Sequence, residues 1–342
     1  MKIGKLTNEQ LSKLVLSRLP SLSSSTLVGA DIGADCAWID LGDSMMVISS
    51  DPITAGGMES GTLTVHVSCN DIAACGVKPS GILIDIIAPP SCEEKDISKI
   101  VDDASREARA LGVDIVGGHT EISESVNTFV VISTAFGIVN KDHPVPLGKA
   151  LEGDSLIVTK TCGIEGSYIA ATEHASKLSS VDRRLINEAL SYVSKISVVP
   201  EGCICGELRS SSGALNERGY KLGACNLLHD VTEGGILGAA YEMADISGLC
   251  VTVDERLIPL SEATDAICRT LNINPYRLIS SGALLIASSE PETVLTALHD
   301  EGIDACVIGR FTSPSEGFIR IDGKTGQECE LNPPQADELY GM

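Results

Sequence analysis

Apolar and polar positions change their period along the first part of the chain, and the changes predict alternating helices and strands. From Leu11 to Leu19 the apolar residues recur at helical spacing until Pro20 stops the pattern. Short apolar runs bounded by turn residues are typical of buried strands, whereas longer runs that end in glycine or proline indicate helices. We therefore expect helices over 7–19, 61–75 and 91–112, and strands over 45–50, 81–87, 113–116 and 129–139.

Two of these helix starts carry a reciprocal side-chain pattern. Thr7 is followed three residues later by Gln10, and Ser91 is followed by Glu94. In such a capping box the first side chain accepts a hydrogen bond from the third helical N–H, and the longer side chain reaches back to the cap. The pattern predicts a helix start at both places.

A stretch rich in proline and glycine, residues 143–153, separates this region from a second one with the same alternation. We place a domain boundary there, which gives domains over 1–148 and 149–326 and a loose polar tail over 327–342. In the second domain we expect strands over 154–159, 283–288, 305–308 and 318–321, and helices over 167–175, 183–198, 233–246 and 292–300. Both domains are therefore predicted to be α/β in class.

Composition and charge exclude several classes of protein. The chain has 342 residues, 43% apolar and 21% charged, which suits a globular protein with its own core. A formal net charge of −22 repels polyanions, so we expect no nucleic acid and no anionic membrane surface as a partner. The sequence shows no apolar run of roughly 18 residues and no basic-then-apolar leader, so we expect a cytoplasmic protein whose cysteines are mostly small buried side chains.

Acidic residues recur beside glycines where the expected elements begin or end. Examples are Asp31, Gly33 and Asp35 in one loop, Asp51 after a strand, Asp71 in a helix of small residues, and Asp230 before Gly234-Gly235. A carboxylate in an apolar segment is costly unless it is paired or bound to a cation. Mg²⁺ prefers carboxylates together with phosphate oxygens, and glycine turns before helices offer N–H groups to phosphate. The pattern favours a metal–nucleotide site, although each aspartate alone also fits a turn or a helix cap.

Five segments stand out in this order: Ile32–Ala37, Ser50–Thr54, Asn70–Pro79, Gly117–Glu121 and Leu228–Gly235. Together they resemble the aminoimidazole ribonucleotide (AIR) synthase superfamily, over about residues 25–325. The Asn70–Pro79 and Asp230–Gly235 blocks are the more specific ones. The segments Asp51–Thr54 and Asp230–Gly235 are most similar to those of the HypE-like branch, the hydrogenase maturation factors.

This resemblance implies a fold of two α/β domains, a homodimer that pairs the N-terminal domains, and an ATP site near that interface. By matched position, it implies that Asp35, Asp51, Asp71 and Asp230 hold Mg²⁺ around the triphosphate. It also implies that Gly33, Asn70, Gly117, Gly118, Thr120, Gly234 and Gly235 contact ATP or phosphate, with catalytic roles for His119 and Asp230. Members of this superfamily use ATP to phosphorylate an oxygen, which needs positioning and charge neutralisation more than a covalent nucleophile.

Two positions depart from the family pattern. His119 stands where relatives carry an acidic residue after the double glycine. Because imidazole suits Mg²⁺ poorly, His119 could bind phosphate, act as an acid or base, leave metal binding to Glu121, or only hydrogen-bond locally in a turn. HypE carries its reacting group on a terminal cysteine, whereas the last cysteine here, Cys329, precedes Pro333-Pro334. We therefore expect no self-dehydrating, cyanide-forming chemistry.

Two functions remain open at this point. The first is a Mg-ATP-dependent enzyme that activates an oxygen of a small or protein-borne substrate by phosphoryl transfer. The second is a nucleotide-binding accessory or regulatory protein that has kept the ATP site and lost catalysis.

Overall fold

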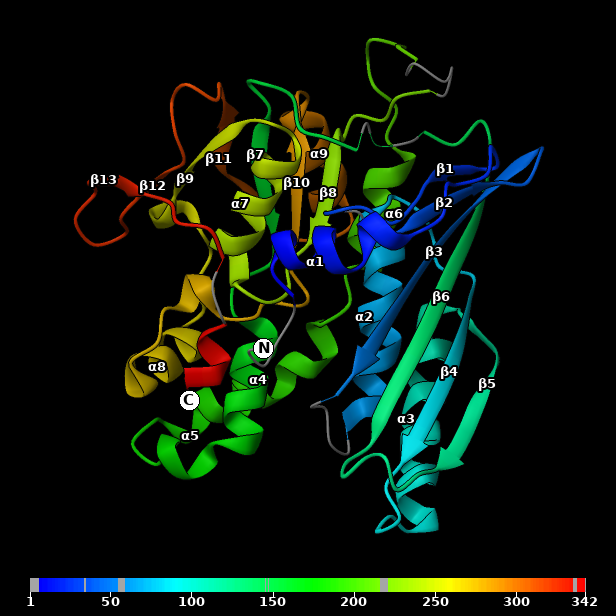
Figure 1. The fold of residues 1–342 in the computed structure, drawn as a ribbon. Coiled ribbons are helices and arrows are strands. Elements are labelled where there is room, and N and C mark those ends of the chain that lie inside the picture. Colours follow the sequence, from blue (N-terminus) through cyan, green and yellow to red (C-terminus); the bar gives the residue numbers. More distant parts are fainter. Residues whose placement is uncertain are drawn as a thin grey trace. The chain divides into compact units, whose positions relative to one another are not determined.

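The computed structural model describes residues 6–33, 35–54, 59–144, 146, 148–215, 221–334 and 337–341. The chain forms two compact units, which we call the N-terminal unit (residues 20–30 and 34–141) and the C-terminal unit (residues 1–19, 31–33 and 142–342). Helix α1 (Asn8–Leu14) thus belongs to the C-terminal unit, although it comes first in the sequence. Each unit contains one sheet with helices, so the predicted α/β class is confirmed (Figure 1).

The N-terminal unit is a six-stranded sheet in the order β1-β2-β3-β6-β4-β5, with α2 and α3 packed against it and against each other. The pairing is antiparallel except between β4 and β5, which run parallel. Its elements are β1 (Thr26–Val28), β2 (Ala37–Asp40), β3 (Ser44–Ile53), α2 (Ser60–Ala74), β4 (Gly81–Ala88), α3 (Glu94–Leu111), β5 (Asp114–Ile122) and β6 (Val130–Asn140).

Strand alternation divides this sheet into a face covered by the helices and a more open face. Val47 of β3 is opposite Gly137 of β6, and a Cβ at Gly137 would lie 2.6 Å from Val77 Cγ1, just beyond α2. Ser133, four residues from Gly137 on β6 and therefore on the same face, hydrogen-bonds to Ser68 of α2 over 2.6 Å. The face that contains Val47 and Ser133 is therefore the one that α2 covers.

The C-terminal unit is built on a seven-stranded sheet in the order β13-β12-β9-β11-β7-β10-β8, mostly antiparallel. Its strands are β7 (Ser155–Thr159), β8 (Leu227–Asp230), β9 (Cys250–Asp254), β10 (Leu284–Ser288), β11 (Ala305–Thr312), β12 (Ile319–Ile321) and β13 (Glu328–Glu330). Its further helices are α4 (Ile164–Glu173), α5 (Arg183–Leu190), α6 (Val199–Glu207), α7 (Gly235–Ile246), α8 (Glu262–Leu271) and α9 (Pro291–Asp300). The core packs α7 against strands β8, β9 and β10, and includes Met243, Val251 and Phe311.

Most predicted elements are confirmed to within a few residues, but four expectations are wrong. The capping box at α3 pairs Glu93 with Asp96 and does not use Ser91, whereas that of Thr7 and Gln10 is present. The helix expected over 183–198 ends at Leu190, where a 3₁₀ segment, Ser191–Lys195, follows. The other two wrong expectations are the buried strand at 113–116 and the loose tail at 327–342.

The strand expected to be buried at 113–116 is instead the start of β5, which continues to Ile122 and is exposed along its whole length in the single chain. A short apolar run does not distinguish an internal strand from one at the edge of a sheet. The expected loop of Gly117–Thr120 is therefore part of this edge strand.

The expected tail is not loose where the structure describes it. Residues 328–330 form β13, which pairs with β12, while Leu331 and Asp337 are 1% and 3% exposed. Residues 335, 336 and 342 lie outside the described part. Among the described residues, no helix is both long enough and apolar enough to cross a membrane.

Candidate active site

Asp71 lies near the end of α2, on the side of that helix that faces the sheet. Its Oδ2 accepts a hydrogen bond of 2.6 Å from the hydroxyl of Ser49 on β3, and its neighbour Asn70 is fully buried. Helix α2 approaches its surroundings closely because its residues are small. At Gly61, for example, a Cβ would lie 2.2 Å from the carbonyl oxygen of Ile100 on α3. The predicted helix thus holds the Asn70-Asp71 pair in a fixed place.

Asp51 lies on the same face of the sheet as Ser49, because the two are two residues apart on β3. In the register of the sheet, Asp51 is opposite Ser133, whose hydroxyl contacts α2. Asp51 and Asp71 are therefore both on the helix-covered side of the N-terminal unit. The extension of β3 through Asp51-Pro52 was not predicted, since Pro52 indicated a strand end.

Asp35 and Asp71 both act electrostatically on the buried thiol of Cys36. The pKa of Cys36 is raised well above its usual range, first by a hydrogen bond with Cys75, then by burial, and then by the negative charges of Asp71 and Asp35. Both carboxylates therefore act on one side chain from within the same unit. Nothing in the sequence indicated that Cys36 and Cys75 are neighbours, because 38 positions separate them in the chain.

The donor set of this region fits Mg²⁺ better than a thiol-binding metal. The three aspartates offer carboxylate oxygens, which hard cations prefer. The neighbouring thiols stay protonated: burial and Asp71 raise the pKa of Cys69 to about 12, and that of Cys36 is raised as well. Since the thiolate is the form that binds metal, the raised pKa values disfavour these cysteines as ligands.

His119, by contrast, lies on the other face of the same sheet. In the register of β4 and β5 it is opposite Asp85, which alternates with the helix-facing Ile84. Its Nε2 lies 3.3 Å from Glu121 Oε2, two residues further on the same strand. Within one chain, the structure does not bring His119 to Asp51 and Asp71, and the predicted catalytic role of His119 stays a prediction.

Gly118 has a structural reason to be glycine. A Cβ there would lie 1.9 Å from the carbonyl oxygen of Ile84, and the φ of Gly118 is +149°, which L side chains rarely adopt. The double glycine thus lets β5 lie against β4. Gly117 and Thr120 are exposed on this strand, so their predicted contact with phosphate would be made from a strand and not from a loop.

The remaining predicted residues lie in the C-terminal unit. Asp230 ends β8 opposite Leu284 of β10 and is 2% exposed. Gly234 and Gly235 both have positive φ at the start of α7, and a Cβ at Gly235 would lie 2.6 Å from Tyr276 O. Gly33, which also has positive φ, packs against Ile246 at the other end of α7. The predicted helix start at residue 233 is thus confirmed to within two positions.

The Gly234 amide already has a partner in the structure. Its N–H donates a hydrogen bond of 2.7 Å to Asp337 Oδ2. Asp337 was not expected at this place, because the sequence around it has the polar composition of a loose tail.

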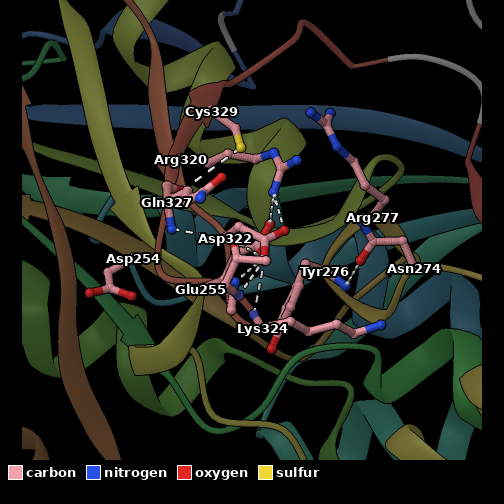
Figure 2. Close-up of polar contacts among 12 residues, drawn as sticks. Asp254, Glu255, Asn274, Tyr276, Arg277, Arg320, Asp322, Lys324, Gln327 and Cys329 are labelled. Atoms are coloured by element: carbon pink, nitrogen blue, oxygen red, sulfur yellow. Dashed lines mark hydrogen bonds and ion pairs between the residues drawn. The ribbon is translucent and has the colours of Figure 1, made fainter.

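A cluster of charged residues lies at the β12 side of the C-terminal unit (Figure 2). Glu255, 5% exposed, accepts hydrogen bonds from Arg320 Nη1 over 2.9 Å and from the backbone N–H of Gly323 over 2.8 Å. The guanidinium of Arg277 points away from this pair in Figure 2 and donates to the carbonyl oxygen of Asn332 over 2.7 Å. The Glu255 pair fixes β12, while Arg277 holds the chain that follows β13.

The molecule thus combines two α/β units, acidic side chains at the α2–β3 contact, and a glycine turn at the start of α7. Family models describe the same two parts: the N-terminal domain of AIR synthase related proteins matches residues 33–139, and the C-terminal domain matches residues 152–322. The chain belongs to the AIR synthase related protein family.

Among its curated relatives is a putative hydrogenase expression/formation protein of Methanocaldococcus jannaschii, 27% identical over 325 residues, which cover 92% of this chain and 90% of the relative. Another is the carbamoyl dehydratase HypE of Cupriavidus necator, 25% identical over 296 residues, which cover 82% of this chain and 77% of HypE.

Solved structures share the fold at low sequence identity. The hydrogenase maturation protein HypE in complex with ATP matches with a TM-score of 0.67 and 20% identity, covering 98% of this chain and 97% of HypE. AaThiL complexed with AMPPCP and TMP matches with a TM-score of 0.67 and 17% identity, covering 91% of this chain and 94% of AaThiL.

Proposed function

We propose that this protein is a Mg-ATP-dependent enzyme that activates an oxygen of its substrate by phosphoryl transfer. The observation that carries the proposal is the group of carboxylates on the helix-covered side of the N-terminal unit, where Asp71 and Asp35 act on the same thiol and Asp51 shares the face. Carboxylate oxygens are the ligands that a hard cation such as Mg²⁺ prefers. A HypE with the same fold was solved in complex with ATP. This likeness supports a nucleotide that binds together with the cation and supplies the phosphoryl group.

In this proposal Asp35, Asp51, Asp71 and Asp230 bind Mg²⁺, as the family resemblance implies. Asn70, Gly33, Gly117, Gly118, Thr120, Gly234 and Gly235 contact nucleotide or phosphate. When bound, the ion would supply positive charge that neutralises the negative charge developing during phosphoryl transfer. The acceptor is a small or protein-borne substrate that presents an oxygen.

The test is ADP release measured with and without Mg²⁺, first alone and then with a panel of small molecules that carry hydroxyl, carboxylate or amide oxygens. Nucleotide binding is followed in parallel by calorimetry, with and without EDTA. We expect ATP to bind only when a divalent cation is present. Equal affinity for ATP in EDTA would overturn the metal part of the proposal.

The second candidate is a nucleotide-binding protein without catalysis. It is favoured by the placement of His119 on the open face, away from Asp51 and Asp71 in one chain. Metal-dependent ATP binding with no ADP release for any acceptor in the panel would support this alternative over the enzyme.

We further propose that two chains form a homodimer through β5. This edge strand exposes Ile115, Val116 and Ile122, which are 40%, 55% and 64% exposed. An uncovered edge with apolar side chains is a template for pairing with another chain, and symmetric pairing through the same strand would cover it.

A further inference from the structure

Helix α2 packs along β3 and β6 in the N-terminal unit (Figure 1), and it buries a line of polar side chains in this contact. Thr64, Ser68 and Asp71 follow one another at spacings of four and three residues, so they lie on one face of the helix. Thr64 and Ser68 are fully buried, and Asp71 is 9% exposed. A helix face that covers a sheet usually carries apolar residues, and a buried hydroxyl is costly unless it is hydrogen-bonded. The hydroxyl groups therefore need partners on the sheet.

Ser133 of β6, 1% exposed, is the partner of both hydroxyl groups, and we call Thr64, Ser68 and Ser133 the hydroxyl network. Ser133 Oγ donates to the carbonyl oxygen of Thr64 over 2.8 Å. It accepts from Thr64 Oγ1 over 2.9 Å and lies 2.6 Å from Ser68 Oγ. Because the single proton of Ser133 Oγ goes to Thr64, Ser68 is the donor in the last pair. Ser133 thus donates one hydrogen bond and accepts two, which is the full capacity of a hydroxyl group.

Ser133 also lies beside one of the aspartates of the proposed metal site. It is directly opposite Asp51 in the register of β3 and β6, and the two side chains share the helix-covered face. The carbonyl oxygen of Ser133 accepts from the hydroxyl of Ser50, the neighbour of Asp51, over 3.1 Å. The saturated Ser133 hydroxyl has no proton left to donate to Asp51. The network therefore holds β3 in place next to Asp51 and takes up none of the carboxylate oxygens of Asp51.

Asp71, the last polar residue of this helix face, is attached to the same strand. Ser49 of β3 donates to Asp71 Oδ2 over 2.6 Å, and Ser49 is two residues from Asp51 on the same face. Asp51 is thus carried by β3 and Asp71 by α2, while the hydroxyl network joins α2 to β6, the strand that pairs with β3. A polar network whose members are all satisfied specifies one arrangement of the elements that it joins. The separation of the two carboxylates follows from that arrangement.

We propose that the residues of the hydroxyl network are positioning residues that make the site selective for Mg²⁺ over Ca²⁺, because they fix the separation of Asp51 and Asp71. This inference rests on the proposed function, in which both aspartates bind the ion. Mg²⁺ is small and demands a near-ideal octahedral set of oxygens, whereas Ca²⁺ accepts more ligands in a flexible geometry. A rigid pair of carboxylates favours Mg²⁺, and a loosened pair loses part of that preference.

Three variants of the full chain change the hydroxyl network. Thr64→Val removes one hydroxyl at nearly constant shape, whereas Thr64→Ser keeps that hydroxyl and removes a methyl group. Ser133→Ala removes the hydroxyl at the centre of the network. The comparison of the two Thr64 variants separates the loss of the hydrogen bond from the loss of packing volume.

The C-terminal unit supplies a matched control. Thr264 is as fully buried as Thr64, and its Oγ1 accepts a hydrogen bond from Ser167 Oγ over 2.9 Å. Thr264→Val therefore removes a buried hydroxyl in the same way as Thr64→Val, outside the N-terminal unit. It shows what the loss of such a hydrogen bond does to the protein when no proposed metal ligand is nearby in the same unit.

The measured quantity is the affinity for metal ions, which requires no turnover. Electron paramagnetic resonance detects free Mn²⁺ and so follows its binding, alone and with the ATP analogue AMPPCP, and Mg²⁺ or Ca²⁺ is then added to displace it. Thr64→Val and Ser133→Ala should weaken Mg²⁺ binding by about tenfold, as expected when an outer partner of a metal site is lost. Ca²⁺ binding should weaken less, so the ratio of the two affinities falls. Thr64→Ser and Thr264→Val should keep the wild-type ratio.

The possible failures of this inference and of the proposed function are distinct. Melting temperatures without metal show which variants are folded, and the Thr64 pair decides the question alone if Ser133→Ala does not fold. A wild-type ratio of Mg²⁺ to Ca²⁺ affinity in folded Thr64→Val, or an equal fall of that ratio in Thr264→Val, would overturn the role of the network and leave the proposed metal site standing. A wild-type protein that binds Mn²⁺ neither alone nor with AMPPCP would overturn the proposed metal site, and the inference with it.

Discussion

The hydroxyl of Ser49 on β3 donates a hydrogen bond of 2.6 Å to Asp71 Oδ2 on α2. The bond joins a strand to the helix that covers it and orients one carboxylate on a side of the unit where Asp51 also lies. A hydrogen bond to a carboxylate stabilises its charged form, which is the form that binds a cation. The orientation of Asp71 is therefore set before any ligand arrives.

Asp71→Asn should weaken Mg-ATP binding by about tenfold or more, because it removes a charge at nearly constant shape. Ser49→Ala should weaken binding less, since the carboxylate is kept and only its orientation is loosened. Calorimetry measures both affinities. Asp102→Asn, on the exposed side of α3, is the control and should bind as the wild type does. A large fall in the melting temperature of Asp71→Asn without ligand would show instead that Asp71 is structural.

Glu165 should make the protein less stable as the pH rises from about 4.5 to about 7. Its pKa is raised from 4.5 to about 7 in the folded chain, first by burial and then by the charges of Asp337 and Glu233, with Ser281 opposing. The folded state therefore holds a proton that the unfolded state has lost, so its stabilising contribution is present below pH 4.5 and is lost as the pH passes through 7.

Glu165→Gln should remove this dependence and raise the free energy of unfolding at pH 8 relative to the wild type, by roughly 3 kcal/mol at most. Urea unfolding at pH 5 and pH 8 measures the difference between the two proteins. A variant that loses stability equally at both pH values would contradict the assignment of the buried proton to Glu165.

Lys160 and Glu201 form a buried ion pair in the C-terminal unit, with Nζ and Oε1 2.5 Å apart. Nζ also donates to the carbonyl oxygens of Ser197 over 2.7 Å and Gly282 over 2.8 Å. Burial lowers the pKa of Lys160, while Glu201 opposes the shift. Lys160→Met should therefore destabilise the protein by about 3–5 kcal/mol, because it leaves the Glu201 charge buried without its cation.

Adding Glu201→Gln to Lys160→Met should recover part of that loss, since the unpaired charge is then removed. Thermal unfolding of the two variants, compared with the wild type, measures the recovery. No recovery in the double variant would show that the loss comes from the carbonyl contacts of Lys160 and not from the ion pair.

Val116→Lys together with Ile122→Lys should convert the proposed homodimer to a monomer, because two charges would then lie in the β5 interface. Light scattering at micromolar concentration measures the mass. Leu257→Lys is the control: Leu257 is 51% exposed, similar to Val116, but belongs to the C-terminal unit. A wild-type protein that is already monomeric, or a double variant that stays dimeric, would refute dimerisation through β5.

The elements with strong periodicity could be predicted from the sequence, and those that depend on sheet position could not. Helix α2 was predicted because small residues line one face of the segment that ends at Gly76, and this placed Asp71 in a helix. The position of β5 was missed because Val113–Val116 has the same apolar pattern at an edge as inside a sheet. His119 was for that reason expected beyond the end of a strand and not within one.

Two residues of the C-terminal unit were missed for a different reason. Glu165 looks like any acid in the first turn of a helix, a place that favours negative charge. Its burial follows from close packing that no local pattern reveals: at Gly166, a Cβ would lie 2.3 Å from Leu278 Cγ. Asp337 stands in a polar segment whose composition predicts a loose tail, whereas backbone amides, among them that of Gly234, 103 residues away in the sequence, give it a fixed place.

The exposure of β5 has a consequence for how the protein is made. If two copies pair through β5 as proposed, a newly folded chain presents a complete strand edge, with Ile115, Val116 and Ile122 uncovered, before it meets a second copy. During that interval the edge can pair with any extended segment nearby, including those of unfolded chains. Slow synthesis at low concentration would lengthen the interval, so soluble yield should depend on how quickly two copies meet as well as on how stably each one folds.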